Sequence, residues 1–182
     1  ELVTYPLKEV ADSTEFARRR PHHVIASARE FSDPKYGVDV LKVEFPADLK
    51  HTKEFCHKVF DSKVREPVYG LDEGKDFYKG LNEACGLPWV ILSGGVDIQE
   101  FLLNLELAVR AGASGFLCGR AIWKDAVPLS ADVDKMERFL LTEGAYNFQR
   151  ANSIAEMARP WFEHPRFQGR HNPELAQGDE KW

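Results

Sequence analysis

Short apolar segments alternate with longer segments of helical periodicity along this chain, and that alternation constrains the fold most strongly. The clearest case is the apolar run Trp89–Leu92, followed by an apolar stripe of helical spacing from Ile98 to Val109. Comparable units begin at Glu1, Val38 and Gly115. Strands that alternate with helices form right-handed βαβ units around a parallel sheet. The sequence therefore predicts an α/β fold with four strand–helix units.

Proline, glycine and acidic residues predict where the helices begin and end. Pro21 is expected at the first position of a helix that runs to Phe31. Gly86 is expected just after the end of a helix that begins near Leu71. Asp97, together with the glutamate three residues later, resembles a capping box. Two further helices are expected over residues 131–141 and 147–158, followed by an extended tail.

A lysine lies within the predicted strand Gly37–Pro46, whose sequence is GVDVLKVEFP. Alternation along a strand puts Lys42 and Glu44 on one face, where the lysine is either exposed at a sheet edge or enclosed in a buried parallel strand. In the buried case the charged form loses solvation, and the neutral amine that a Schiff base requires becomes available. Glu1 is either a proton-transfer acid facing this lysine or a solvated terminal residue. Glu44 is an alternative charge partner, and Tyr5 a weaker candidate for proton transfer.

The last two predicted strands each end in a glycine-containing turn, Ser-Gly-Gly after the first and Gly-Arg after the second. Glycine lets backbone N–H groups approach an anion closely, and arginine can add a bidentate contact to phosphate. Each turn alone fits an ordinary loop. Their occurrence at the ends of successive strands favours phosphate binding. The candidate phosphate-binding residues are Ser93, Gly94, Gly119 and Arg120.

Composition excludes several classes of partner for this chain of 182 residues. A net charge of −5 gives no reason to expect nucleic acid or an anionic membrane, and no apolar run is long enough to span a bilayer. Cys56, Cys85 and Cys118 lack CxxC spacing and are expected to be free thiols in a reducing compartment, by default the cytoplasm. The adjacent residues His22 and His23 cannot share a helix face, and neither a metal nor another cofactor is predicted.

Three motifs in order, VDVLKVEFP, PWVILSGGV and GASGFLCGRAIW, resemble the tagatose-1,6-bisphosphate aldolase family. These are class I, Schiff-base aldolases of the (β/α)8 TIM-barrel fold, related to deoxyribose-phosphate and sulfofructose-phosphate aldolases. The likeness extends from Glu1 to about Val127. It implies that residues 1–127 are the C-terminal half of a barrel, strands 5 to 8, and that residues 128–182 add C-terminal helices and a tail to the same domain.

The resemblance also implies roles for individual residues. Lys42 matches the imine-forming lysine of the sixth strand, and Glu1 falls where the acid–base glutamate is expected. Ser93 and Arg120 match residues that hold a substrate phosphate, with Gly94 and Gly119 beside it. The implied reaction is reversible cleavage of a phosphorylated ketose to dihydroxyacetone phosphate and an aldehyde, without a metal.

The first four strands of such a barrel are missing from this sequence, which begins with Glu1 rather than Met. The chain is therefore expected to be either a fragment of a longer enzyme or a natural half-barrel. A half-barrel would expose two strand edges, so a homo-oligomer is expected. Besides the tagatose-bisphosphate aldolase, two functions stay open: a sulfofructose-phosphate aldolase or transaldolase, and a non-catalytic phosphosugar-binding remnant.

Overall fold

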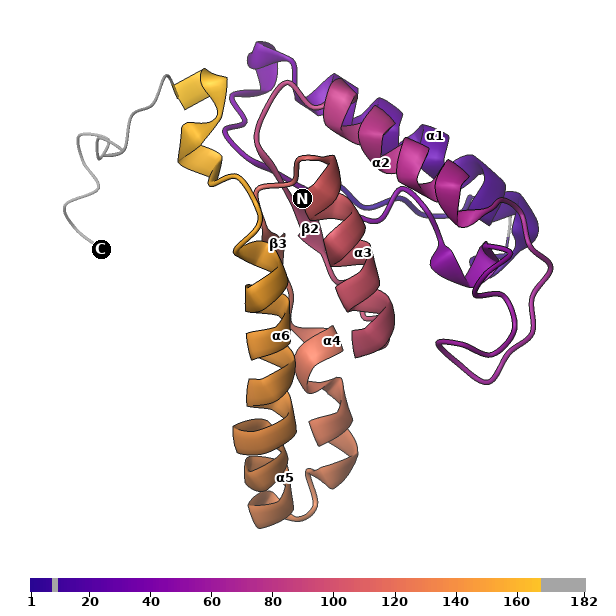
Figure 1. Ribbon diagram of the computed structural model, residues 1–182, viewed down its shortest axis with the longest axis vertical. Helices are drawn as coiled ribbons and strands as arrows, with labels where there is room; N and C mark the ends of the chain where they lie inside the picture. Colours follow the sequence, from indigo (N-terminus) through magenta and orange to yellow (C-terminus); the bar gives the residue numbers. More distant parts are fainter. Residues whose placement is uncertain (8–9, 168–182) are drawn as a thin grey trace.

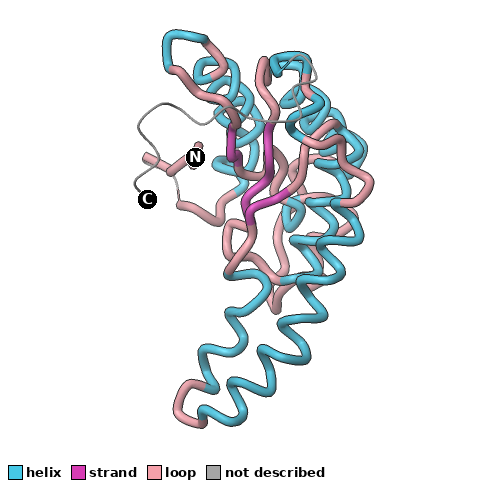
Figure 2. Tube along the Cα trace, turned by 90° about the vertical axis from the view of Figure 1, so that its left-hand side faces the viewer, coloured by secondary structure: helices cyan, strands magenta, loops and turns pink. Residues whose placement is uncertain are grey.

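The computed structural model describes residues 1–7 and 10–167, in which helices pack against a small parallel sheet (Figure 1). The strands are β1 (Leu41–Val43), β2 (Trp89–Leu92) and β3 (Phe116–Leu117), in that spatial order (Figure 2). Both strand pairs are parallel. Leu2 extends the sheet beyond β1 through a parallel bridge to Val43. The predicted α/β class with a parallel sheet is confirmed.

The strand register separates two faces of the sheet. Lys42 pairs with Val90, and Leu92 pairs with Leu117, so these side chains share one face. The opposite face packs against the helices. Its strand residues are Leu41, Val43, Trp89, Ile91 and Phe116. Alternation therefore puts Lys42 on the sheet face that points away from the helix-packed core.

The lysine strand is shorter than the predicted segment Gly37–Pro46. Ladder bonds to β2 begin where Leu41 N donates to the carbonyl oxygen of Pro88, at 3.0 Å. Pro88 itself has no N–H group, so it cannot donate to the residues that precede Leu41. Val38 and Val40 accordingly lie outside β1.

Three long helices form the layer that covers the sheet. They are α1 (Thr14–Phe31), α2 (Leu71–Ala84) and α3 (Ile98–Ala111). Figure 1 shows α1 and α2 side by side, and α3 packs next to α2. Every residue of the predicted α3 stripe is buried. The stripe consists of Ile98, Phe101, Leu102, Leu105, Ala108 and Val109.

The predicted start of α1 at Pro21 is wrong. The helix begins at Thr14, because Ser13 caps it and its side-chain oxygen accepts a hydrogen bond from Phe16 N at 3.2 Å. Pro21 lies inside the helix and is buried there. Proline in a helix interior forfeits one backbone hydrogen bond, a cost that this well-capped and partly buried helix tolerates.

Two other helix ends lie where they were predicted but differ in their detailed geometry. Cys85 is the extended C-cap of α2, and Gly86 is not in the left-handed conformation but donates its N–H to Ser32 Oγ at 3.1 Å. Asp97 caps α3 as predicted, through a 2.8 Å bond from Gln99 N. The Glu100 carboxylate lies 3.4 Å from Lys50 Nζ, and so faces a lysine from another segment.

The C-terminal helices form a rod that extends beyond the sheet in Figure 1. After the short α4 (Arg120–Trp123), the rod consists of α5 (Val133–Phe139), a π-helical turn (Leu140–Gly144) and α6 (Ala145–Ala155). The two helices predicted for this region are therefore joined by the π turn. α6 packs against α3. Within the described ranges, no helix combines the length and apolarity that a membrane crossing would need.

Short 3-10 helices complete the described chain: Pro34–Tyr36, Leu49–His51, Lys124–Leu129, Trp161–Glu163 and Pro165–Phe167. The predicted extended tail lies partly outside the described residues, which end at 167.

The long connection between β1 and α2 is fastened by ion pairs. Two isolated bridges also lie within it, Thr52 with Tyr69 and His57 with Val64. Arg65, whose side chain is only 8% exposed, donates to Asp12 Oδ1 at 2.7 Å. It also donates to Asp61 Oδ2 at 2.7 Å. The bond to Asp12 ties the connection to the segment that precedes α1.

Candidate active site

The structure brings together the two residues expected to carry the chemistry. Lys42 Nζ donates to Glu1 Oε2 at 2.9 Å. The Lys42 side chain is 28% exposed and that of Glu1 51%. Lys42 is therefore half-buried, between the exposed sheet edge and the buried strand that the sequence left open. The pairing follows from the sheet: Leu2 N donates to the Lys42 carbonyl oxygen at 2.8 Å, and Leu2 bridges to Val43, which aligns Glu1 with Lys42.

The charge on Glu1 is stabilised by its cationic neighbours. The hydrogen bond from Lys42 is the main cause that holds the Glu1 pKa below its ordinary value, and the charge of Arg120 contributes to the same shift. Glu1 is therefore a carboxylate at neutral pH, and it accepts a hydrogen bond from Lys42 Nζ. The influence of Arg120 also indicates that the guanidinium lies within electrostatic range of the Glu1–Lys42 pair.

Glu44 is not the charge partner of Lys42. Its Oε1 accepts a hydrogen bond from Thr4 N at 2.6 Å, and its Oε2 pairs with Arg20 at 3.0 Å. Arg20 also donates Nε–H to the Phe45 carbonyl oxygen at 2.8 Å. The alternative that assigned Lys42 to Glu44 is therefore wrong, because other donors occupy both carboxylate oxygens.

The turn after β2 provides a surface of backbone against which Arg120 lies. Gly94 and Gly95 have left-handed φ values of 58° and 73°. A Cβ built on Gly95 would approach Arg120 Cζ to 3.2 Å. Glycine at this position thus permits close contact between the guanidinium and the turn. Arg120 itself is exposed and, within the described residues, forms no salt bridge.

Ser93 and Gly119 lie at the ends of the neighbouring strands β2 and β3. The Ser93 side chain is buried and lies beside the Cys118 thiol at the end of the next strand. Burial raises the Cys118 pKa, so this thiol is kept protonated. Gly119 is the N-cap of α4, and a Cβ there would approach the Trp123 indole nitrogen to 3.1 Å.

One cation at this site was missed in the sequence analysis. Lys124 Nζ donates to the Gly95 carbonyl oxygen at 3.4 Å, beside the turn on which Arg120 lies. Its spacing of four residues from Arg120 in a helical segment was the available signal. Tyr5, by contrast, is strongly exposed and lines a groove with Phe16 and His23, so it is not gathered with the Glu1–Lys42 pair.

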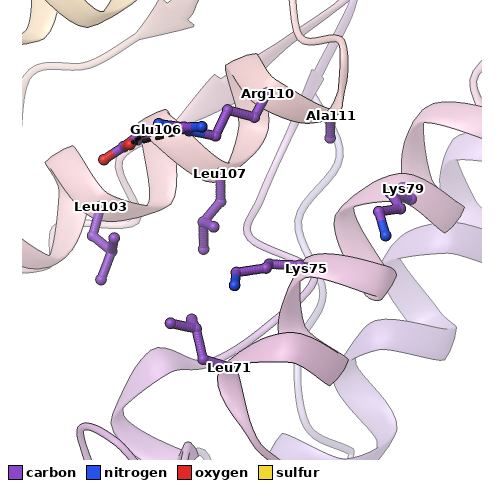
Figure 3. Close-up of a pocket in the computed structure, with 8 residues that line it drawn as sticks. All are labelled: Leu71, Lys75, Lys79, Leu103, Glu106, Leu107, Arg110 and Ala111. Carbon is purple, nitrogen blue, oxygen red and sulfur yellow. Dashed lines mark hydrogen bonds and ion pairs between the residues drawn. The ribbon is translucent and has the colours of Figure 1, made fainter.

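Of two cavities in the structure, one borders the candidate residues and the other does not. A groove of about 430 Å³ lies between α2 and α3, with Leu71, Leu103 and Leu107 in its lining and lysines on one side (Figure 3). It contains none of the candidate residues. A second cavity, of about 330 Å³, has Phe45 and Gly94 from the ends of β1 and β2 in its lining. The second cavity therefore borders the candidate phosphate site.

The described residues contain no group of three or more His, Cys, Asp or Glu side chains placed to hold a metal ion. All three cysteines are free thiols, as predicted.

The arrangement suits chemistry in which an amine, a carboxylate and an anion-binding group act on one molecule. Lys42 supplies a nucleophilic nitrogen when deprotonated, and Glu1 is within hydrogen-bond reach of that nitrogen. Arg120 and Lys124 supply positive charge at the ends of β2 and β3. A small molecule with a carbonyl group and a phosphate fits these three functions.

Comparison with known proteins gives matches over most of the chain. The family model for the DeoC/LacD family aldolase matches residues 2–125. The tagatose 1,6-diphosphate aldolase of Lactococcus lactis is 38% identical over 168 residues, which cover 88% of this chain and 49% of that protein. Tagatose 1,6-diphosphate aldolase 2 of Enterococcus faecalis is 36% identical, over 88% of this chain and 48% of that protein. The tagatose 1,6-diphosphate aldolase of Streptococcus pneumoniae is 35% identical, over 90% of this chain and 50% of that protein. The chain spans about half the length of these curated relatives.

Proposed function

We propose, because this chain belongs to the DeoC/LacD family of aldolases, that it carries the Schiff-base centre of a class I aldolase acting on a phosphorylated ketose. The relatives' names support tagatose 1,6-bisphosphate as the substrate. The observation that carries the proposal is the 2.9 Å contact between Lys42 Nζ and Glu1 Oε2 on the sheet face away from the helices.

In the proposed reaction, Lys42 acts as nucleophile and Glu1 moves protons. Glu1 accepts a proton from the Lys42 ammonium, and the free amine adds to the substrate ketone to give a carbinolamine. Glu1 returns its proton to the carbinolamine hydroxyl, which departs as water and leaves an iminium ion. Cleavage of the adjacent carbon–carbon bond sends its electron pair into the iminium to form an enamine, while the Glu1 carboxylate takes the hydroxyl proton and the aldehyde departs. Protonation and hydrolysis of the enamine then release dihydroxyacetone phosphate and regenerate the amine.

The phosphate is proposed to bind where the turns after β2 and β3 meet. Arg120 lies on the Gly95 backbone, and Lys124 is bonded to the same turn. Because Arg120 has no carboxylate partner within the described residues, its guanidinium is available to an anion. Ser93, Gly94 and Gly119 complete the proposed site around it.

The proposed architecture is the C-terminal half of a (β/α)8 barrel. Four parallel segments in sequence order, each followed by a helix, support it, as does the match to about half of each relative. Active sites of such barrels lie at the C-terminal ends of the strands, where the candidate residues are found. The free thiols of the three cysteines suit a reducing compartment such as the cytoplasm.

The proposal is tested by aldol cleavage assays on the chain and on two lysine variants. Lys42→Met should abolish cleavage of tagatose 1,6-bisphosphate. Lys79→Met, at an exposed lysine of α2, should leave the rate unchanged. Appreciable cleavage by a folded Lys42→Met variant would refute the role of Lys42. Cleavage of sulfofructose phosphate but not of tagatose 1,6-bisphosphate would replace the proposed substrate.

A further inference from the structure

Glu44 is a buried carboxylate held by two donors from different parts of the chain. It follows β1 directly and is nearly inaccessible to solvent. Its side chain bonds to Thr4 N at 2.6 Å and to Arg20 of α1 at 3.0 Å. A buried carboxylate destabilises a fold unless it is paired and fully hydrogen-bonded, and the bonds from Thr4 and Arg20 meet this requirement for Glu44.

The bond to Thr4 acts on the segment that carries Glu1. That segment is attached to β1 by a backbone bond from Leu2 N to the Lys42 carbonyl oxygen, at 2.8 Å. Two residues further along, the Thr4 N–H is accepted by the Glu44 side chain. The carboxylate therefore provides a second anchor for the segment, on the same strand that carries Lys42.

Arg20 fixes the Glu44 carboxylate in turn. Its guanidinium contacts both the carboxylate and the Phe45 carbonyl oxygen, the latter at 2.8 Å, so the side chain is held at two points. Its positive charge also balances that of Glu44, which lies two residues after Lys42 in the chain. Glu44 is thereby kept from competing with Glu1 for the lysine.

We infer that Glu44, held by Arg20, is a positioning residue that sets Glu1 against Lys42 by anchoring Thr4. The inference rests on the proposed function of the Glu1–Lys42 pair. Glu44 does not touch the reacting atoms in this account. It acts through the placement of Glu1, and a displacement of about 1 Å in such a group can cost roughly a hundredfold in rate.

Two substitutions at Glu44 separate positioning from a merely structural role. Glu44→Gln keeps an oxygen that can accept from Thr4 N but loses the ion pair with Arg20. Glu44→Met has a side chain of similar size but keeps neither the acceptor for Thr4 N nor the ion pair with Arg20. A purely structural role predicts that activity follows stability in both variants. Positioning predicts that Glu44→Gln is less stable yet active, whereas Glu44→Met has a low kcat.

The first measurement needs no substrate. Carboxyl-labelled glutamate is titrated by ¹³C NMR, with Glu1 assigned from the Glu1→Gln variant. In the unaltered chain the Glu1 pKa is held down by Lys42. It should remain low in Glu44→Gln and return towards its ordinary value in Glu44→Met. The inference would be overturned if the Glu1 pKa stayed low in Glu44→Met, or if it rose by the same amount in both variants.

The second measurement is steady-state aldol cleavage at a temperature where all variants are folded. Glu44→Met should lose about a hundredfold in kcat with little change in KM, and Glu44→Gln should stay within about threefold of the unaltered chain. Should Glu44→Met fold poorly, Thr4→Pro removes the donor instead while leaving the Glu44–Arg20 pair, and the same losses are expected. A fully active, folded Thr4→Pro variant would overturn the anchoring role.

Failure of the proposed function gives a different result. If the unaltered chain neither cleaves substrate nor forms an imine, the proposed function of this chain is wrong. The NMR titration still decides whether Glu44 sets the position of Glu1.

Discussion

Substitution of Gly95 by alanine tests whether the turn after β2 and Arg120 form one anion-binding unit. Gly95 has a φ of 73°, and its added Cβ would lie 3.2 Å from Arg120 Cζ. The left-handed conformation alone should cost about 1–2 kcal/mol of stability. The added Cβ should shift the guanidinium by a few tenths of an ångström and weaken a charge-assisted contact with phosphate that is worth roughly 1.5–3 kcal/mol in full, so the loss in affinity should stay below about 150-fold.

Gly37 offers a matched control for this experiment. Its φ is 63°, and a Cβ there would meet nothing within 4 Å. Gly37→Ala should therefore carry a similar conformational cost without disturbing Arg120. The assay pairs thermal unfolding with calorimetric titration of dihydroxyacetone phosphate. Equal destabilisation in the two variants, with weakened binding only in Gly95→Ala, is expected. Unchanged affinity in Gly95→Ala would show that the contact between Arg120 and the turn does not contribute to phosphate binding.

Three further predictions concern stability. Arg65→Met should make the midpoint temperature of unfolding depend less on pH in acid, because Arg65 lowers the pKa of Asp61 to about 2 and also lowers that of Asp12. A carboxyl group whose pKa is lower in the folded chain stabilises the fold above its unfolded pKa, near 4, and this stability is lost as the pH falls through the folded pKa. If the midpoint temperature of Arg65→Met falls between pH 4 and 2 as steeply as that of the unaltered chain, the ion-pair account is contradicted. Burial raises the Glu100 pKa to about 7, so its ionisation is easier in the unfolded chain, and the unaltered chain should lose on the order of 3 kcal/mol of stability as the pH rises from 4.5 to 7. Glu100→Gln should abolish this loss. The same pH dependence in the variant would assign the loss to another group. Phe101→Ala should cost about 3–5 kcal/mol in chemical denaturation, because its side chain is fully buried, and a cost below 1 kcal/mol would contradict the core described for α3.

The fold was predictable where the apolar pattern was strong. Trp89–Leu92 and the stripe of α3 are read directly from short and periodic apolar runs, and both are confirmed. The family resemblance is confirmed by the match over residues 2–125. Pro21 misled the prediction of α1 because its local preference for a first helical turn was outweighed by the Ser13 cap and by burial in the core.

The site was predictable only as far as neighbouring strands could be aligned. The contact between Glu1 and Lys42 follows from parallel strand pairing, and the structure shows it. The partner of Glu44 was not predictable, because Arg20 lies 24 residues earlier in the chain and meets Glu44 only through the packing of α1 on β1. The roles proposed for Ser93, Gly94, Gly119 and Arg120 remain predictions.

The central claim, that Lys42 forms an imine with a phosphorylated ketose, is tested most directly by borohydride trapping. The folded chain is incubated with dihydroxyacetone phosphate, reduced, digested and examined by peptide mass spectrometry. The account predicts a reduced adduct on the peptide that contains Lys42, and none in the Lys42→Met variant. A folded, phosphate-binding chain that gives no adduct on Lys42 would contradict it and leave a phosphosugar-binding protein without Schiff-base chemistry.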